Sequence, residues 1–400
     1  MAIFKYKTKD LKGQEVIGEI DSTDLRTAVI LLRKKGLIVI SVSPKLKNNL
    51  LFLDKFINRV SFNDLVTFTR QLATMIGAGL VLSEAIDILE EQQTNKKFKI
   101  ALADVAHDIK GGLNLAAAFN KHPDVFPQLY VNLVKSGEAS GKLDEVLLKM
   151  ADTLEKEREF RARVKGALIY PAVVISMMLG VMTIMMVFVI PKLTALYSES
   201  TLDLPLPTKI LIFVSSAFAN FWWLMLIILV IVILVLKKWV STPGGRVTYD
   251  TLLLKVPIVG ILITNVTLTN LSRTFGLLIS SGLPLLDAIS IVESVTSNAI
   301  FKKVLRDSHQ GVERGLPFST LLNVPIFPRI VGQMIKVGEE TGKVDEIFFR
   351  LSDYFETESD HMVKNLTVAI EPIILVVLGI GVAFLVISII LPIYKLTTSF

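Results

Sequence analysis

Three long apolar blocks constrain this chain more than any other feature of its sequence. They cover residues 167–191, 210–236 and 368–393; the first two contain no charged residue, and the third contains only Glu371. A helix that rises about 1.5 Å per residue needs about 20 mainly apolar residues to cross a bilayer, and each block is long enough. A buried core helix rarely runs this far without a charge. The sequence therefore predicts three transmembrane helices.

The composition of the remaining residues is ordinary. Hydrophobic residues make up 52% and charged residues 20% of the 400 residues, with a mean hydropathy of +0.57. Without the three blocks these shares become about 45% and about 25%, as in soluble proteins. The composition argues against disorder, which needs low hydrophobicity and high charge. The chain has no cysteine, which excludes disulfides, thiolate catalysis, iron–sulfur clusters and cysteine-based zinc sites.

An internal repeat organises the polar regions. Residues 62–193 match residues 265–396 at an offset of about 200. The first block thereby pairs with the third, and the second block has no counterpart. Two repeats in the same orientation need one extra helix to return the chain between them, and the second block is expected to be that helix. The aligned residues include Arg70 with Arg273, Phe126-Pro127 with Phe327-Pro328, and Tyr170-Pro171 with Glu371-Pro372.

Basic residues near the block ends predict the orientation in the membrane. Five Lys or Arg residues lie between Lys156 and Lys165, and three more, Lys237, Lys238 and Arg246, follow the second block. The loop at 192–209 is poor in them. We therefore expect this loop to be external and both large polar regions to be cytosolic. Residues 1–12 lack the apolar stretch of a signal peptide, so the first domain is expected to stay where it is made.

The sequence leaves open where the second transmembrane helix begins on its outer side. Trp222 and Trp223 lie inside it, although tryptophan favours membrane interfaces. A span that starts later than Ile210 would leave residues 210–219 along the membrane surface.

These observations predict a mainly α, polytopic membrane protein with two homologous cytosolic helical bundles and a small N-terminal α/β module. Apolar residues at helical spacing, such as Leu65, Phe68 and Leu72, indicate helices in the repeats, whereas the first residues alternate as strands do. The expected parts are an α/β module at 1–44, a linker at 45–61, a helical bundle at 62–166, a transmembrane helix at 167–191, an external loop at 192–209, a transmembrane helix at 210–236, a cytosolic connector at 237–264, a second bundle at 265–367, a transmembrane helix at 368–393 and an external tail at 394–400.

A Gly-Lys motif occurs once in each repeat, at residues 135–145 and 336–346. It is not a nucleotide-binding P-loop, because the glycine spacing is one residue short and Leu or Val stands where Ser or Thr should bind magnesium. The motif is typical of a turn that joins two helices, with Asp144 or Asp345 favouring the next helix N-terminus. We expect these turns to be packing or partner elements. Their candidate residues are Gly137, Glu138, Gly141, Lys142, Asp144 and Glu145, with Gly338, Glu339, Gly342, Lys343, Asp345 and Glu346.

The sequence gives little support for metal binding, nucleic-acid binding or proton transport. No two of the four histidines lie three or four residues apart, as the ligands of a helical zinc site would. The basic run at 156–165 is interleaved with glutamates, which argues against nucleic-acid binding. Glu371 is the only ionisable residue within a block; a proton relay and a structural role at the membrane edge are both open, and the structural role is favoured. The candidate intramembrane residues are Pro171, Pro191, Glu371, Pro372 and Pro392.

Over nearly its whole length the chain resembles a known family. The motifs that carry this resemblance are Phe4-Lys-Tyr6 with Gly13 and Gly18, Phe68-Thr-Arg70-Gln-Leu with Gly79, both Gly-Glu-x-[Ser/Thr]-Gly-Lys-x-Asp-Glu turns, Tyr170-Pro171 with Pro191, Thr242-Pro-Gly-Gly-Arg246, and Glu371-Pro372 with Pro392. Their order, and the presence of a copy in each repeat, is similar to what is found in the inner-membrane platform proteins of bacterial type IV pilus assembly and type II secretion. The N-terminal module occurs in both branches and does not choose between them.

The resemblance implies a non-enzymatic adaptor without a cofactor. Its expected partners are a hexameric assembly or retraction ATPase, pilin or pseudopilin subunits, other inner-membrane components of the machine and the lipid bilayer, and a homo-oligomer is expected. The pilus branch is favoured, with the secretion branch as the alternative. A transporter is a remote alternative, because it would need several polar groups within the membrane and only Glu371 is present.

Overall fold

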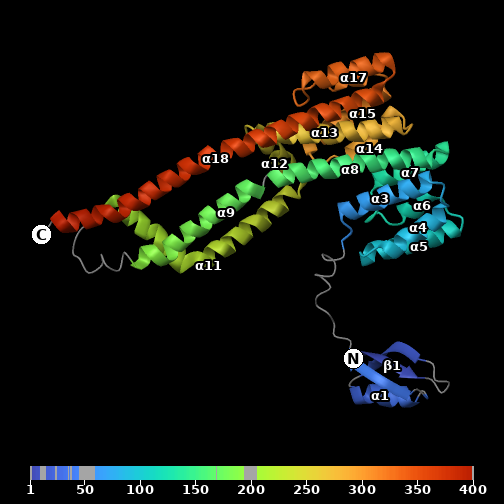
Figure 1. Ribbon diagram of the computed structural model, residues 1–400, viewed down its shortest axis with the longest axis horizontal. Helices are drawn as coiled ribbons and strands as arrows, with labels where there is room; N and C mark the ends of the chain where they lie inside the picture. Colours follow the sequence, from blue (N-terminus) through green and yellow to red (C-terminus); the bar gives the residue numbers. More distant parts are fainter. Residues whose placement is uncertain are drawn as a thin grey trace. The chain divides into compact units, whose positions relative to one another are not determined.

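The structure is a computed structural model that describes residues 2–9, 15–22, 25–34, 36, 38–44, 59–167, 169–192 and 205–398 (Figure 1). Most of the expected linker at 45–61 and of the expected external loop at 192–209 lies outside the described residues, as do the last two residues of the tail. The chain divides into two compact units. One comprises Met1–Arg59 with Asn95–Lys97, and the other Val60–Thr94 with Phe98–Phe400.

The described residues of the N-terminal unit form a three-stranded antiparallel sheet and one helix. Its elements are β1 (Ala2–Lys9), β2 (Glu15–Ser22), α1 (Leu25–Lys34) and β3 (Ile38–Pro44). The strand order is β2-β1-β3, with Phe4 opposite Ile20 and a register shift between Lys7 and Thr8 on the β3 side. Leu32 of α1 is fully buried, which shows that the helix covers part of the sheet unit.

The first repeat consists of six helices around a phenylalanine-rich core. They are α3 (Phe62–Gly77), α4 (Leu82–Gln92), α5 (Lys96–Lys110), α6 (Leu115–Asn120), α7 (Gln128–Ser140) and α8 (Leu143–Ala167). A capping box begins α3, because Ser61 and Asp64 each accept a hydrogen bond from the other's backbone N–H. In the core, Phe68, Phe98 and Phe126 contact one another at centroid distances of 5.3 to 6.0 Å.

The second repeat follows the same plan after one additional helix. Its helices are α12 (Pro243–Lys255), α13 (Val259–Ser280), α14 (Leu285–Val295), α15 (Ala299–Glu313), α16 (Phe318–Leu321), α17 (Arg329–Thr341) and α18 (Val344–Thr398). Phe275 stacks on Phe348 at 4.7 Å and also contacts Phe318. A single cluster of buried apolar residues runs through both repeats, so they fold against each other rather than as separate bodies.

Three helical stretches, Leu143–Lys192, Leu206–Val240 and Val344–Leu391, each contain a segment long and apolar enough to cross a membrane. Among the described residues, the prediction of three helices long and apolar enough to span a membrane is thereby confirmed. The bent pair of α12 and α13 is also apolar enough, but the two helices are separated by a bend of 111° and α13 packs into the second repeat. α8 and α18 run side by side from the repeats toward the apolar segments (Figure 1).

The apolar segments differ in detail from the predicted blocks. The first is α9 (Ile169–Ile184) followed by a π-helical turn, η1 (Met185–Val189), and the third continues as helix to Thr398. The second, α11 (Leu206–Val240), breaks at Phe221, directly before Trp222 and Trp223. Residues 210–219 are helical and lie before this break, where Leu211 packs against η1. Their place within the membrane or along its surface stays a prediction.

Hydrogen bonds between the apolar helices hold their ends together. The Ser215 hydroxyl of α11 donates to the Met186 carbonyl of η1 at 2.5 Å, and the Thr208 hydroxyl donates to the Ser388 carbonyl of α18 at 2.7 Å. All these side chains are buried. Such bonds replace part of the hydrophobic force that is missing between helices in lipid. The first half of α11 therefore joins the other two apolar segments.

Candidate functional site

The Gly-Lys motif forms the same tight turn in both repeats. Gly141 directly follows α7 and Gly342 directly follows α17, and their φ angles of 69° and 72° are left-handed. The next backbone N–H, of Lys142 or Lys343, returns to the carbonyl of Gly137 or Gly338 at 2.9 and 3.0 Å. This pattern satisfies helix-end carbonyls and needs glycine at the left-handed position, because a Cβ there is strained.

The first glycine of each motif lets two helices approach closely. A Cβ at Gly137 would lie 3.1 Å from the Val146 Cβ, and one at Gly338 would lie 3.1 Å from the Ile347 Cγ1. Both glycines are buried. The turn between α7 and α8, and the turn between α17 and α18, therefore fix the angle at which each long helix leaves its repeat.

The glutamate of each motif points inward rather than toward solvent. The Glu138 carboxylate accepts hydrogen bonds from the backbone N–H groups of Leu115 and Ala116, at 2.6 and 3.1 Å. In the second repeat, Glu339 accepts hydrogen bonds from the N–H groups of Phe318 and Ser319. These are the first N–H groups of α6 and α16, which have no partner within their own helix. The two glutamates thus hold a short helix in place in each repeat.

The remaining motif residues lie at the surface. Lys142 and Glu145 form an exposed ion pair at 3.4 Å, and Lys343 and Glu346 form its counterpart at 3.2 Å. Asp144 is exposed and Asp345 half-buried, and both lie in the first turn of a long helix. The candidate residues thus separate into an inward set that shapes the fold and an outward set that a partner could reach.

A second pair of repeated contacts was missed by the sequence analysis. Arg70 on α3 donates hydrogen bonds to Glu155 and Asp152 on α8, with an Nε–Oε1 distance of 2.8 Å to Glu155. At the aligned positions of the second repeat, Arg273 on α13 forms an ion pair with Glu356 on α18. The signal was available, because the two arginines align and Glu155 and Glu356 lie 201 residues apart. A search for opposite charges duplicated in both repeats would have found both pairs.

The two copies of this ion pair have different surroundings. The Arg70 side chain is 30% exposed, whereas the Arg273 side chain is 4% exposed and its guanidinium lies 5.9 Å from the Phe160 ring centroid. The hydrogen bond from Arg70 lowers the pKa of Glu155, and that bond together with the one to Asp152 raises the pKa of Arg70. Burial raises the pKa of Tyr130, which hydrogen-bonds the Thr69 hydroxyl within the first repeat.

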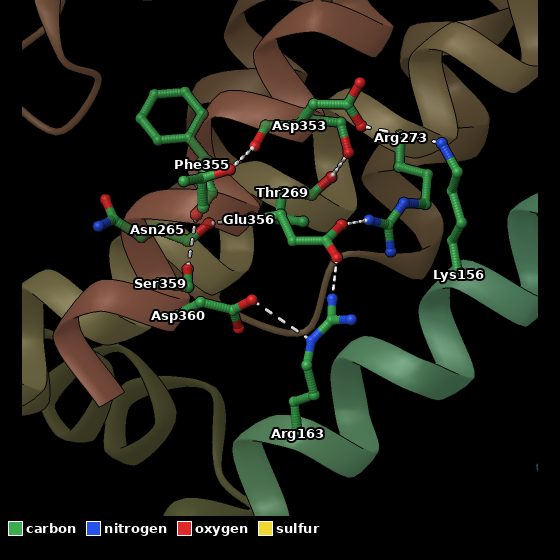
Figure 2. Close-up of polar contacts among 12 residues, drawn as sticks. Lys156, Arg163, Asn265, Thr269, Arg273, Asp353, Phe355, Glu356, Ser359 and Asp360 are labelled. Atoms are coloured by element: carbon green, nitrogen blue, oxygen red, sulfur yellow. Dashed lines mark hydrogen bonds and ion pairs between the residues drawn. The ribbon is translucent and has the colours of Figure 1, made fainter. Parts of the chain in front are cut away.

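In the second copy of this ion pair, Glu356 also contacts an arginine of the first repeat (Figure 2). Arg163 on α8 forms an ion pair with Glu356, and its Nε lies 3.3 Å from an Asp360 oxygen. Glu356 therefore lies between two arginines, one from each repeat. This three-residue contact, here called the Arg163–Glu356–Arg273 bridge, lies shortly before α8 and α18 enter their apolar segments.

Further contacts join the repeats farther from the apolar segments. The Ser136 hydroxyl donates to the Ser281 carbonyl at 2.7 Å, and the Lys149 ammonium donates to the Ser280 carbonyl at 2.9 Å. A cleft of about 490 Å³ lies along the same seam, between α3, α7 and α8 on one side and α12, α13 and α14 on the other. The seam is thus polar at both ends.

The intramembrane candidates are scattered. Pro171 is buried, whereas Glu371 and Pro372 are exposed on α18, and the Glu371 carboxylate makes no hydrogen bond or ion pair with the described residues. The side chain of Pro392 lies outside the described set. Among the described residues, no group of three or more His, Asp or Glu side chains could hold a metal ion.

A tandem-repeat helical membrane protein is the class that this fold and these duplicated contacts define. The family model for the type II secretion system protein F matches the chain twice, at residues 68–191 and 271–392, and the model for the N-terminal domain of that protein matches residues 1–43. The chain belongs to the type II secretion system protein F family. The double match shows that each half of the chain contains one copy of the same family unit.

This chain is similar both to type IV pilus assembly proteins and to type II secretion system proteins. The type IV pilus assembly protein PilC of Thermus thermophilus is 35% identical over 99% of this chain and 98% of its own length. PilC of Myxococcus xanthus is 31% identical over 99% and 95%. The type II secretion system protein F of Xanthomonas campestris pv. campestris is 31% identical over the full length of both chains. With the three apolar helices, this family membership supports an inner-membrane protein.

Proposed function

We propose that this protein is the non-enzymatic inner-membrane platform of a type IV pilus assembly machine. In this role it couples a cytosolic assembly ATPase to the extraction of pilin subunits from the membrane and to their polymerisation. The observation that carries the proposal is the connection between the repeats and the membrane. In each repeat, the long charged helix that follows the Gly-Lys turn leads into an apolar segment.

The long helices suit a mechanical role. α18 has 55 residues, which corresponds to roughly 80 Å of helix. The Arg163–Glu356–Arg273 bridge ties α8 to α18 and α13 just before the apolar segments. A displacement imposed on the repeats would therefore reach two membrane helices together.

In this proposal both repeats and the N-terminal unit are cytosolic, and the C-terminal end of α18 is external. The basic residues at 156–165 and at 237–246 support this orientation. Because the chain has no cysteine, single cysteines at Lys302 and Lys209 can report it directly. We expect a membrane-impermeant maleimide to label Lys209→Cys in intact cells and Lys302→Cys only after lysis. The reverse pattern would contradict the orientation.

The outward residues of the two Gly-Lys turns are the proposed partner elements. Lys142, Asp144 and Glu145 are exposed in the first repeat, and the equivalent turn of the second repeat exposes Lys343 and Glu346. Charge reversal at Asp144 and Asp345 is expected to weaken binding of the assembly ATPase while membrane levels stay normal. Unchanged binding in a correctly folded variant would remove these turns from the interface. Other machine components and further copies of this chain complete the proposed set of partners.

A secretion platform is the second candidate function. It is supported by the 31% identity to the secretion protein of Xanthomonas campestris, against 35% for the pilus protein of Thermus thermophilus. The neighbouring genes separate the two: a prepilin peptidase and a retraction ATPase indicate a pilus, whereas an outer-membrane secretin set indicates secretion.

Deletion of the gene tests the proposed function. We expect surface pili to disappear while pilin accumulates in the membrane, and plasmid-borne wild-type protein to restore them. Intact pili with a loss of protein secretion would favour the second candidate. ATP hydrolysis by the purified protein would contradict a non-enzymatic platform. Ion flux through liposomes that contain the protein would favour the transporter alternative.

A further inference from the structure

Helix α12 directs its one acidic residue toward the protein and exposes several apolar residues. Asp250 is 6% exposed, and its carboxylate accepts a hydrogen bond from the Ala299 N–H at 2.7 Å, at the start of α15. Arg246 donates to the Ser297 carbonyl at 2.8 Å. Leu252, by contrast, is 57% exposed. This is the reverse of the arrangement on a water-facing surface helix, whose apolar side covers the core.

The exposed apolar surface continues around the bend between α12 and α13. Six apolar side chains between residues 249 and 261 are 38 to 57% exposed and are here called the α12 corner: Tyr249, Leu252, Val256, Ile258, Val259 and Ile261. Monomeric soluble proteins rarely expose many large apolar side chains close together without a function for them.

The backbone of the α12 corner is strained at one residue. Ile258 has φ 70° and ψ −56°, and the Val259 N–H donates to the Pro257 carbonyl at 2.8 Å. This is a classic γ-turn, which is rare, and a positive φ is a genuine outlier for a β-branched residue. The side chain of Ile258 is 48% exposed, so burial within the protein does not offset this strain.

The α12 corner is continuous with a membrane-spanning helix and carries positive charge. α11 ends at Val240, two residues before the α12 N-cap Thr242, and its last turn contains Lys237, Lys238 and the exposed Trp239. Tryptophan and lysine at the end of a span mark the membrane interface. Lys255 adds another exposed cation, and the one acidic residue between 237 and 261 is the buried Asp250.

We propose that the α12 corner lies in the headgroup region of the bilayer, on the side of the two repeats, and binds anionic phospholipid. The apolar side chains contact the upper acyl carbons, and Lys237, Lys238 and Lys255 contact the lipid phosphates. The second repeat is thereby anchored to the membrane surface by α12 in addition to α18. This inference rests on α11 spanning the membrane and does not depend on the pilus function.

Depth-dependent quenching in the full-length protein tests the location. Because the chain lacks cysteine, Leu252→Cys and Ile258→Cys can each carry one environment-sensitive fluorophore. Val337→Cys on α17 is the matched control, since Val337 is also apolar and 50% exposed. In nanodiscs, we expect lipids brominated near the headgroup to quench the labels at 252 and 258 but not the label at 337.

Two results would overturn the location. Labels at 252 and 258 that are quenched by aqueous iodide as strongly as the label at 337 would place the α12 corner in water. Labels shielded from both iodide and brominated lipid would show that a protein, such as a second copy of this chain, covers it. Either result leaves the proposed platform function intact.

The lipid charge is tested by comparing brominated phosphatidylglycerol with brominated phosphatidylcholine. The ratio of their quenching constants at position 252 measures the preference for anionic lipid. Removal of one interfacial cation by Lys238→Gln or Lys255→Gln is expected to lower this ratio about fivefold. Lys303→Gln, an exposed lysine on α15, is the control and should leave it unchanged. A ratio near one in the parent protein would contradict binding of anionic lipid.

Discussion

At the scale of single residues, one ion pair occurs twice in this protein with different degrees of burial. Glu155 and Glu356 occupy the same place in the two repeats, and each binds the arginine of its own repeat. Arg70 is partly exposed and also binds Asp152, whereas Arg273 is almost fully buried. The free-energy cost of desolvating a cation is large only when water cannot reach it. Equivalent substitutions should therefore have unequal effects.

We expect Glu356→Gln to lower the free energy of unfolding by about 3–5 kcal/mol, because it leaves the buried Arg273 facing a neutral amide and a second arginine, Arg163. Glu155→Gln leaves Arg70 with Asp152 and with access to water, and should cost less than about 1 kcal/mol. Unfolding of the detergent-solubilised protein measures both values. Equal losses in the two variants would show that burial does not separate the two pairs.

The pH dependence of the first pair follows from the lowered pKa of Glu155. The hydrogen bond from Arg70 favours the charged carboxylate in the folded protein, so the unfolded chain binds the proton more tightly. The stabilisation is fully present above the unfolded pKa of about 4.3 and is lost as the pH falls through the lower, folded pKa. We expect the stability difference between wild type and Glu155→Gln to shrink over this acidic range. A difference that is constant from neutral pH to below pH 4 would contradict this account.

At the scale of elements, the turns before α8 and α18 determine where the long helices begin. Gly141→Ala and Gly342→Ala place a Cβ on a left-handed residue and should each cost about 1–2 kcal/mol of unfolding free energy. Lys142→Ala and Lys343→Ala, at the next residue, remove only exposed side chains and should stay within about 0.5 kcal/mol. Thermal unfolding compares the four variants. A lysine variant as unstable as its glycine neighbour would mean that the side chain, not the backbone angle, holds the turn.

Much of the element pattern could be predicted from the sequence, because its causes are local. Uninterrupted apolar runs indicated the membrane segments, and the Gly-Lys motifs indicated turns that join two helices. The break of α11 at Phe221 could not be predicted in this way. No proline or glycine lies at residue 221, and the first half of the helix is held by contacts with residues far along the chain, at Met186 and Ser388.

The candidate site was predicted in part for the same reason. The repeated motif identified the right turns, but the inward role of Glu138 depends on α6, which lies more than 20 residues away. The Arg163–Glu356 contact of the bridge has no equivalent in the repeat pattern, since it joins one repeat to the other. Pairings between repeats depend on how two bundles pack, which a repeat alignment within one chain does not contain.

At the scale of the whole molecule, the proposed function requires that motion pass from the repeats to the membrane through continuous helices. α18 is one helix from Val344 to Thr398, and residues 364 and 365 lie between its repeat and its apolar segment. Lys364 and Asn365 are both exposed and make no hydrogen bond or ion pair with the described residues. Their replacement changes the stiffness of the helix with little effect on packing.

The double variant Lys364→Gly/Asn365→Gly is therefore expected to uncouple the two parts of α18. Each glycine costs about 1 kcal/mol of helix stability relative to alanine. The matched control is Lys364→Ala/Asn365→Ala, which removes the same side chains and strengthens the helix. We expect the glycine variant to lose most surface pili, or most secretion in the alternative machine, at normal membrane levels and normal ATPase binding, and the alanine variant to keep them. Wild-type activity of the glycine variant would show that a rigid α18 is not required, and equal loss in both variants would assign the effect to the removed side chains.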